Sequence, residues 1–246
     1  MKIALLDKMN IEICVSTPFD TAIAQEAGAD RVELCGHWEC GGLTPTSASV
    51  RASVNIGIPV RVLIRPRAGD FVYNSSEKQL MIAEALDCLD AGAEMVVVGG
   101  LDESGNVDEN LLEILCEKIS SELMVFHRAL DLSNDPLESA KIIQDFGIRS
   151  VLSSGGAKAA GLGLGLLGDF SELGLKVIAG GGVRLEDIVT LGEAGVEAVH
   201  ASCRLKTSSN HFKNIDEELF DLSTYPVDFD KALQLCDTVL KWNKDE

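Results

Sequence analysis

The chain has 246 residues, of which 46% are hydrophobic and only 5% aromatic, so it can build a sizeable and mainly aliphatic core. Thirty-nine acidic residues against 21 basic ones give a formal net charge of −18, which repels nucleic acid phosphates and anionic membrane surfaces. Nucleic acids and membranes are therefore not expected as partners.

The sequence also indicates a compartment. Its apolar segments are all shorter than a membrane span, and the apolar run within Met1–Asp7 is too short for a signal peptide. The seven cysteines are scattered along the chain, which favours free thiols in a reducing environment over a disulfide framework. We therefore expect a cytoplasmic protein.

A short pattern recurs six times along the chain. A helix-like segment ends at a glycine, an apolar residue follows, and a β-branched run then begins. Glycine can adopt the left-handed conformation that ends a helix, so each copy predicts a junction between a helix and a strand. The six glycines are Gly28, Gly57, Gly92, Gly147, Gly174 and Gly195.

These junctions and two further apolar runs predict eight strands that alternate with helices. Such alternation is typical of parallel strands joined by crossover helices. Eight units in about 200 residues favour a (β/α)8 TIM barrel, one α/β domain over residues 1–246, over an open doubly wound sheet. The predicted strands are Ile11–Val15, Arg31–Cys35, Val60–Arg65, Met95–Gly99, Leu123–Arg128, Ser150–Ser154, Lys176–Ala179 and Ala198–Cys203.

Three of the predicted helices are distinctive. The fourth spans Asp108–Ser120. The sixth is expected to be short or irregular, because Gly161–Gly168 contains four glycines, each costing about 1 kcal/mol relative to alanine in a helix interior. The eighth is the apolar-periodic run Phe229–Trp242, which follows a long loop that includes the polar stretch Thr207–Asn210.

Two acidic residues are predicted to face the barrel interior. Side-chain alternation puts Glu12 and Glu33 opposite the apolar face of the first two strands. Ionised carboxylates are costly there unless they are paired, and Arg65 or Arg128 are the expected partners. The pairs could form a purely structural ion network or belong to an active site.

Charged residues and glycines follow the predicted strands at their carboxyl ends, where TIM barrels carry their functional groups. Arginines and glycine-rich turns can bind phosphate or carboxylate groups, so we predict a site for a small anionic molecule. Solvated strand ends and tight turns are the structural alternatives. The candidates are Arg65, Arg67, Asp70, Arg128, Ser154, Gly155, Gly156, Gly181, Gly182, His200 and Arg204.

Catalytic residues for such a molecule can also be proposed from the sequence. His127 ends the fifth strand and is the candidate general acid or base. Glu33 or Asp131 would orient it. The reaction itself is not indicated by any motif.

The cysteines near the first two strands suggest a different ligand. Cys14, Cys35 and Cys40 would gather soft thiolates, which suit Cu(I) or Zn(II). The spacing between Cys35 and Cys40 is not a recognised zinc pattern. A metal site therefore stands beside the anion site as a second hypothesis.

The same residues resemble the CutC family from about residue 10 to 205, which leaves 206–246 as a C-terminal extension. The resemblance implies a cytoplasmic TIM barrel, often a homo-oligomer such as a homodimer, with a role in copper homeostasis. It implies copper as a ligand but no established reaction, so a barrel enzyme acting on a phosphorylated or carboxylated metabolite stays open as the alternative. The runs that carry the resemblance are Arg31-Val-Glu-Leu-Cys35, Gly41-Gly-Leu-Thr-Pro45, Ile64-Arg-Pro-Arg67, Gly69-Asp-Phe-Val-Tyr73, Phe126-His-Arg-Ala129, Ser154-Gly-Gly156 and Gly180-Gly-Gly-Val183.

Overall fold

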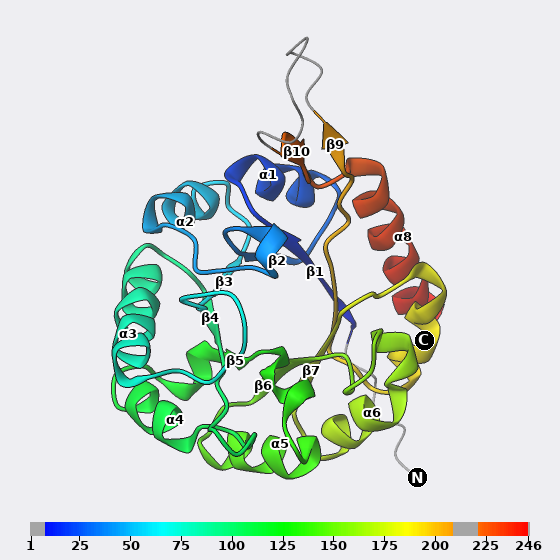
Figure 1. Cartoon of the computed structure of the whole chain (residues 1–246). Helices are drawn as coiled ribbons and strands as arrows, with labels where there is room; N and C mark the ends of the chain where they lie inside the picture. The colour runs from blue at the N-terminus through cyan, green and yellow to red at the C-terminus, as the bar shows by residue number, and fades with distance from the viewer. Residues whose placement is uncertain (1–7, 209–220, 246) are drawn as a thin grey trace.

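The computed structural model describes residues 8–208 and 221–245, and within them eight parallel strands close into a barrel (Figure 1). The predicted TIM barrel is thus confirmed. Six strands end one or two residues earlier than predicted, because their last polar residues already belong to the loops. The strands are β1 Asn10–Val15, β2 Arg31–Leu34, β3 Val60–Leu63, β4 Met95–Val98, β5 Met124–Phe126, β6 Ser150–Ser153, β7 Lys176–Gly180 and β8 Ala198–Ala201.

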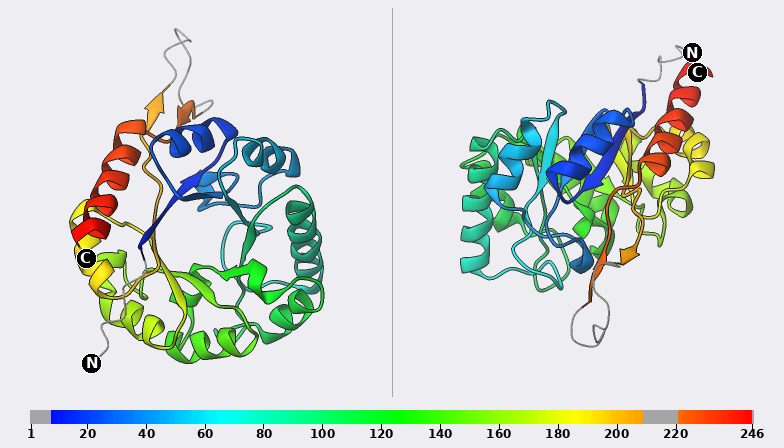
Figure 2. Two further views of the ribbon diagram at one scale, coloured as in Figure 1. Left: turned by 180° about the vertical axis from the view of Figure 1, so that it is seen from behind. Right: turned by 90° about the horizontal axis from the view of Figure 1, so that it is seen from above.

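Helices surround the barrel and alternate with its strands (Figure 2). α4 ends at Cys116, four residues before the predicted end of that helix. The irregular sixth helix is confirmed, since the 3-10 turn Ala160–Leu162 precedes it, and the backbone of Gly163 packs so closely on Gly155 that no side chain would fit. The helices are α1 Pro18–Glu26, α2 Ser47–Val54, α3 Ser75–Asp90, α4 Glu109–Cys116, α5 Pro136–Asp145, α6 Leu164–Glu172, α7 Ile188–Glu193 and α8 Phe229–Asp245.

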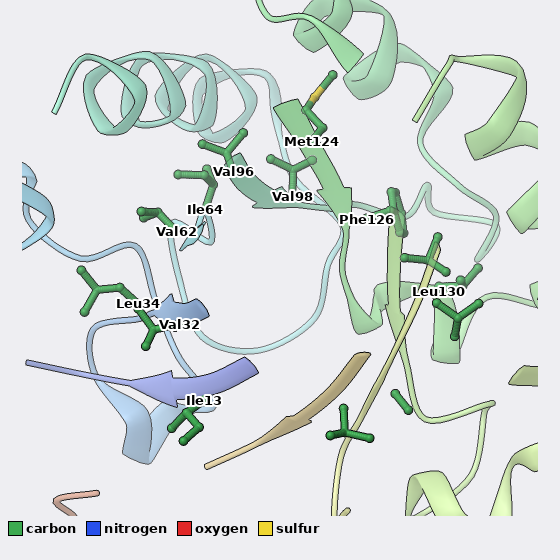
Figure 3. Packing of buried hydrophobic residues seen from close by; sticks show 14 of the residues in the cluster. Ile13, Val32, Leu34, Val62, Ile64, Val96, Val98, Met124, Phe126 and Leu130 are labelled. Atoms are coloured by element: carbon green, nitrogen blue, oxygen red, sulfur yellow. The ribbon is translucent and has the colours of Figure 1, made fainter. Parts of the chain in front are cut away.

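The main core lies between the barrel and its helices. Alternate side chains of each strand point outward into this layer and are almost completely buried, as Figure 3 shows for Val32, Val62 and Phe126. Because a strand alternates its side chains, the residues between them must point into the barrel. The outward face is almost entirely apolar, with Ser153 at the end of β6 as a polar exception, so most of the charged and polar strand residues lie on the inward face.

Helix α8 completes the ring of helices although a long segment of the sequence separates it from β8. It packs against α7, α1 and β1 (Figure 2). Its Asn243 binds both the N–H and the carbonyl of Met9, at 2.9 and 3.0 Å, and Trp242 lies directly against Gly192 of α7. The C-terminal segment is therefore part of the barrel wall, which confirms it as the eighth helix.

Two expectations fall partly outside the described residues: the lack of a signal peptide, which rests on Met1–Asp7, and the end of the polar stretch Thr207–Asn210. Among the helices of residues 8–208 and 221–245, none combines the length and the apolarity that crossing a bilayer requires.

The barrel interior is divided between an apolar side and a polar side. Leu63, Val97, Val125 and Ile178 belong to an apolar cluster contributed mainly by β3 to β7. The polar side is formed by inward residues of β1, β2, β8 and the start of β3, which carry two acids, two arginines, a thiol and an imidazole: Glu12, Glu33, Arg31, Arg61, Cys14 and His200. The polar side makes a column through the barrel, and each charge on it needs a partner.

Glu12 is the centre of this polar column, at 1% exposure. Its Oε2 accepts hydrogen bonds from Arg31 Nε at 2.6 Å and Arg61 Nη1 at 3.3 Å, and Arg31 also pairs with Glu197 at 2.9 Å. The expected partners, Arg65 and Arg128, were wrong. They lie beyond the ends of β3 and β5, whereas the inward arginines on the entry halves of β2 and β3 reach Glu12 directly.

Replacing Arg31 with Met should destabilise the protein strongly, because it leaves the buried Glu12 short of positive charge. Breaking a buried pair in this way costs about 3–5 kcal/mol, and urea unfolding measures it. Arg184→Met is the control, since Arg184 and Glu186 form an exposed pair at 3.7 Å that contributes less than about 1 kcal/mol. The double variant Glu12→Gln/Arg31→Met should recover much of the loss; equal stability of Arg31→Met and the control would contradict the role of this pair.

Candidate functional site

A pocket of about 590 Å³ opens at the carboxyl ends of the strands, where the βα loops meet. Every strand except β4 contributes lining residues at or just beyond its end, and the first half of α8 supplies Lys231, Gln234 and Leu235. Beyond β4 the ring of His127 lies against Gly99, where a side chain would collide with it. The pocket has the size typical of small-molecule sites.

Two thiols line one wall of the pocket. Cys14 Sγ of β1 and Cys35 Sγ, just beyond β2, are 3.7 Å apart, and Ser16 Oγ lies 3.9 Å from the second sulfur. The register of the two parallel strands pairs Cys14 with Glu33, so Cys35 is the next inward residue above that pair. The two sulfurs approach each other at the barrel mouth although Cys35 lies one inward position further along its strand.

A histidine and a carboxyl group lie beside these thiols. His200 Nδ1 donates to Glu12 Oε1 at 2.8 Å, and its Nε2 lies 3.4 Å from Glu33 Oε2. Ligand atoms of Cys14, Glu33 and His200 all lie within 4.8 Å of one another. The cluster offers one sulfur, one nitrogen and one oxygen to a metal ion, and Cys35 Sγ lies at its edge, 3.7 Å from Cys14 Sγ.

The carboxyl and imidazole groups of this cluster have shifted pKa values. Burial raises the pKa of Glu33 to about 7, and the charge of Glu12 adds to this effect. Burial acts on Glu12 in the same direction, but the hydrogen bond from His200 and the charge of Arg31 outweigh it and hold the pKa of Glu12 well below its usual range. Burial lowers the pKa of His200, yet its hydrogen bond to Glu12 and the charge of Glu33 leave it raised overall.

The two thiols titrate as a pair. The hydrogen bond between the sulfurs raises the pKa of Cys14, and burial raises it further. The same hydrogen bond lowers the pKa of Cys35 against the effect of burial. Cys35 is thus the thiol that ionises first, while Cys14 keeps the shared proton.

His127 lies on the pocket wall of β5, away from the thiols, and is 4% exposed. Burial lowers its pKa to about 3, so the imidazole is neutral near neutral pH. Nδ1 accepts the backbone N–H of Ala129 at 3.1 Å, so the neutral ring carries its proton on Nε2, which has no partner among the described residues. Neither Glu33 nor Asp131 orients the ring as expected from the sequence; the backbone of its own loop does.

The arginines that follow β3 serve mainly to hold loops. Arg65 lines the pocket, but its Nη atoms donate to the carbonyls of Cys40, Gly42 and Gly69 at 2.7–3.1 Å. Arg67 does not line the pocket. It pairs with Glu77 of α3 at 2.6 Å and with Asp70 at 3.0 Å. These two arginines of the predicted anion site therefore mainly stabilise the loops at the rim of the pocket.

The carboxylate of Asp131 occupies the glycine-rich turn after β6, where an anionic ligand was expected. It accepts the backbone N–H groups of Ser154 and Gly156 at 3.1–3.2 Å, and it pairs with Arg128 Nε at 2.8 Å. Ser154, Gly155 and Gly156 are absent from the pocket lining as described. The anion in this turn is therefore the protein's own Asp131 carboxylate. Held in this way, Asp131 in turn fixes the position of Arg128.

Some of the remaining predicted residues line the pocket and others do not. Gly181, Gly182 and His200 line the pocket. Arg204 instead donates to Cys14 O and Ser16 Oγ, at 3.2 and 2.8 Å, and so joins the ends of β8 and β1. Cys40 is exposed and lies outside the described pocket lining, so it is not brought to the other two thiols.

Sequence reasoning missed several residues of the pocket and its supporting network. Arg31 and Arg61 could have been recognised, because they share the period-two alternation of Glu33 and Arg65. Trp38 and Leu235 carried no such signal. They come from a loop and from α8, and only the closed ring brings them to the same pocket.

Comparison with known proteins identifies close similarity over most of the chain. The model of the CutC family matches residues 9–205. A family protein CutC from Edwardsiella ictaluri is 34% identical over 94% of this chain and 98% of its own length, and one from Yersinia pseudotuberculosis is 34% identical over 89% and 91%.

Solved structures agree with this match. A chain from Streptococcus agalactiae that bears the name copper homeostasis protein CutC has a TM-score of 0.73 and 26% identity, covering 79% of this chain and 98% of its own. Thiamine phosphate pyrophosphorylase from Pyrococcus furiosus has a TM-score of 0.57 at 14% identity over 97% of this chain and 99% of its own, a likeness of fold alone.

Replacing Glu33 with Gln should stabilise the protein more at alkaline than at acidic pH. The carboxyl has its pKa raised from 4.5 to about 7 on folding, so its effect on stability becomes unfavourable as pH rises from the unfolded pKa through the folded one. At about 1.4 kcal/mol per pKa unit, the advantage of the variant should be roughly 2–3 kcal/mol larger near pH 8 than near pH 5. Urea unfolding at both pH values measures it, and an advantage that does not grow with pH would show that Glu33 is ionised at little cost.

Proposed function

Because the chain belongs to the CutC family, we propose that it takes part in copper homeostasis by binding Cu(I) through Cys14 and Cys35. The observation that carries the proposal is the 3.7 Å separation of their sulfurs at the mouth of the barrel. Thiolates are the ligands that Cu(I) prefers among protein side chains. A bound ion would be the cargo of the protein.

The surroundings of the two sulfurs support this proposal. Cys35 is 3% exposed, so one of the two ligand sulfurs is shielded from solvent. A copper dithiolate carries net negative charge, which His200 can offset because its pKa is raised. The Glu33 carboxyl is also within reach as a further metal ligand.

The free state of the cysteines supports a cytoplasmic location as part of the same proposal. All seven thiols are unpaired, including the neighbours Cys14 and Cys35. Adjacent free thiols persist where the environment is reducing. A homodimer also belongs to the proposal, on the grounds of the family resemblance, and light scattering of the purified protein would test it.

Copper titration of cysteine variants tests the proposal. Under anaerobic conditions and in competition with a chromophoric Cu(I) chelator, the protein should take up one equivalent of Cu(I), and Cys14→Ser and Cys35→Ser should each lose most of this affinity. Cys40→Ser is the matched control, since that thiol is exposed and outside the described pocket lining, and it should bind like the unsubstituted protein.

The same titration with Zn(II) separates the two soft metals. A mixed set of sulfur, nitrogen and oxygen donors also suits zinc, so Glu33→Gln should weaken zinc binding more than Cu(I) binding. Cu(I) binding that survives the double change Cys14→Ser/Cys35→Ser would overturn the thiolate site.

A further inference from the structure

The wall of the pocket formed by β5 and β7 is built from hydrogen-bond donors. β5 lies across the closed barrel from β1, which carries the first of the thiols. His127, Arg128, Gly181 and Gly182 all line this wall. It shares no residue with the sulfur cluster, so it calls for a separate explanation.

Arg128 is held in place at this wall. Asp131 fixes its Nε at 2.8 Å, and Ser154 Oγ accepts from its Nη2 at 3.0 Å. The guanidinium lies flat against Gly181, where an added Cβ would come within 2.8 Å of Cζ. Nη1 has no hydrogen bond to any described residue, and the side chain is 44% exposed, so a charged donor faces the pocket from a fixed support.

His127 adds a neutral donor next to this arginine. The ring is buried, its Nδ1 is engaged by Ala129, and the Nε2 proton lacks a partner among residues 8–208 and 221–245. Leaving a buried donor without a partner destabilises the folded protein. A ligand that accepts this hydrogen bond would remove that cost.

The turn after β7 supplies backbone donors at the same wall. Gly181 and Gly182 both have positive φ, at 98° and 62°, and line the pocket. Their N–H groups find no acceptor within the described part of the chain. Successive N–H groups in such conformations form concave sites for anions.

From these contacts we infer that the pocket binds the phosphate or carboxylate group of a small molecule, held by Arg128 Nη1, His127 Nε2 and the N–H groups of Gly181 and Gly182. All of these groups donate and none accepts, which matches an oxyanion. The apolar lining from Leu63, Leu152 and Leu185 would contact the rest of the molecule. This site is independent of the proposed copper site, since it uses none of its ligands.

Binding of two simple probes to variants of the whole chain tests the inference. Inorganic phosphate and succinate are titrated by calorimetry into the unsubstituted protein and into Arg128→Gln, Arg128→Lys and Gly181→Ala. Losing a charge-assisted hydrogen bond should lower the affinity for the preferred probe roughly tenfold or more in Arg128→Gln. Arg128→Lys should keep part of it, and Gly181→Ala should weaken it by displacing the guanidinium.

Arg51→Gln is the matched control, because it removes one positive charge from the exposed surface of α2, and it should bind both probes unchanged. Circular dichroism confirms that each variant is folded. In the NMR spectrum, the preferred probe should shift the amide signals of Gly181 and Gly182 and the Nε2 proton of His127, and the Cys14→Ser variant should show the same shifts.

The two probes distinguish the chemical sources of the anion. Saturable binding of phosphate points to a phosphorylated ligand, and saturable binding of succinate points to a carboxylated one. Absence of saturable binding by both, or affinities that Arg128→Gln leaves unchanged, would overturn the inference whatever the outcome of the copper titration.

Discussion

The buried carboxylate of Glu12 is the interaction on which the polar half of this barrel depends. It accepts from Arg31 at 2.6 Å, from Arg61 at 3.3 Å and from His200 at 2.8 Å. A carboxylate without these partners would be too costly to bury. Since His200 in turn approaches Glu33, the ion network below the pocket sets the position and charge of the groups at its floor.

Above this network, the loops of the mouth are held by charges that the protein satisfies internally. Arg65 binds three carbonyls of neighbouring loops, and Asp131 fills the turn after β6. These contacts use up several groups that could otherwise bind a ligand. The groups that remain available to a ligand are the thiol pair on one wall and Arg128 with His127 on the other. Both are held in position by rigid neighbours.

The two walls suit ligands of opposite character. The sulfur wall presents soft donors that favour a metal cation, and the wall of β5 and β7 presents only hydrogen-bond donors, which favour an anion. A pocket of about 590 Å³ has room for both beside its apolar lining. Copper handling and the binding of a small anionic molecule are therefore compatible within one barrel.

The sequence by itself determined the architecture and much of the inward face, because alternation along each strand depends only on local geometry. It therefore placed Glu12 and Glu33 inside and put Cys14 and Cys35 on neighbouring strands. Only the tertiary structure decided which charges meet. Arg31 replaced Arg65 as the partner of Glu12, and the carboxylate of Asp131 accepts from the loop after β6 rather than from His127, because pairing depends on strand register and on the level of each side chain in the barrel. The wall supplied by α8 likewise required closure of the ring, which brings residues 14 and 235 to one pocket.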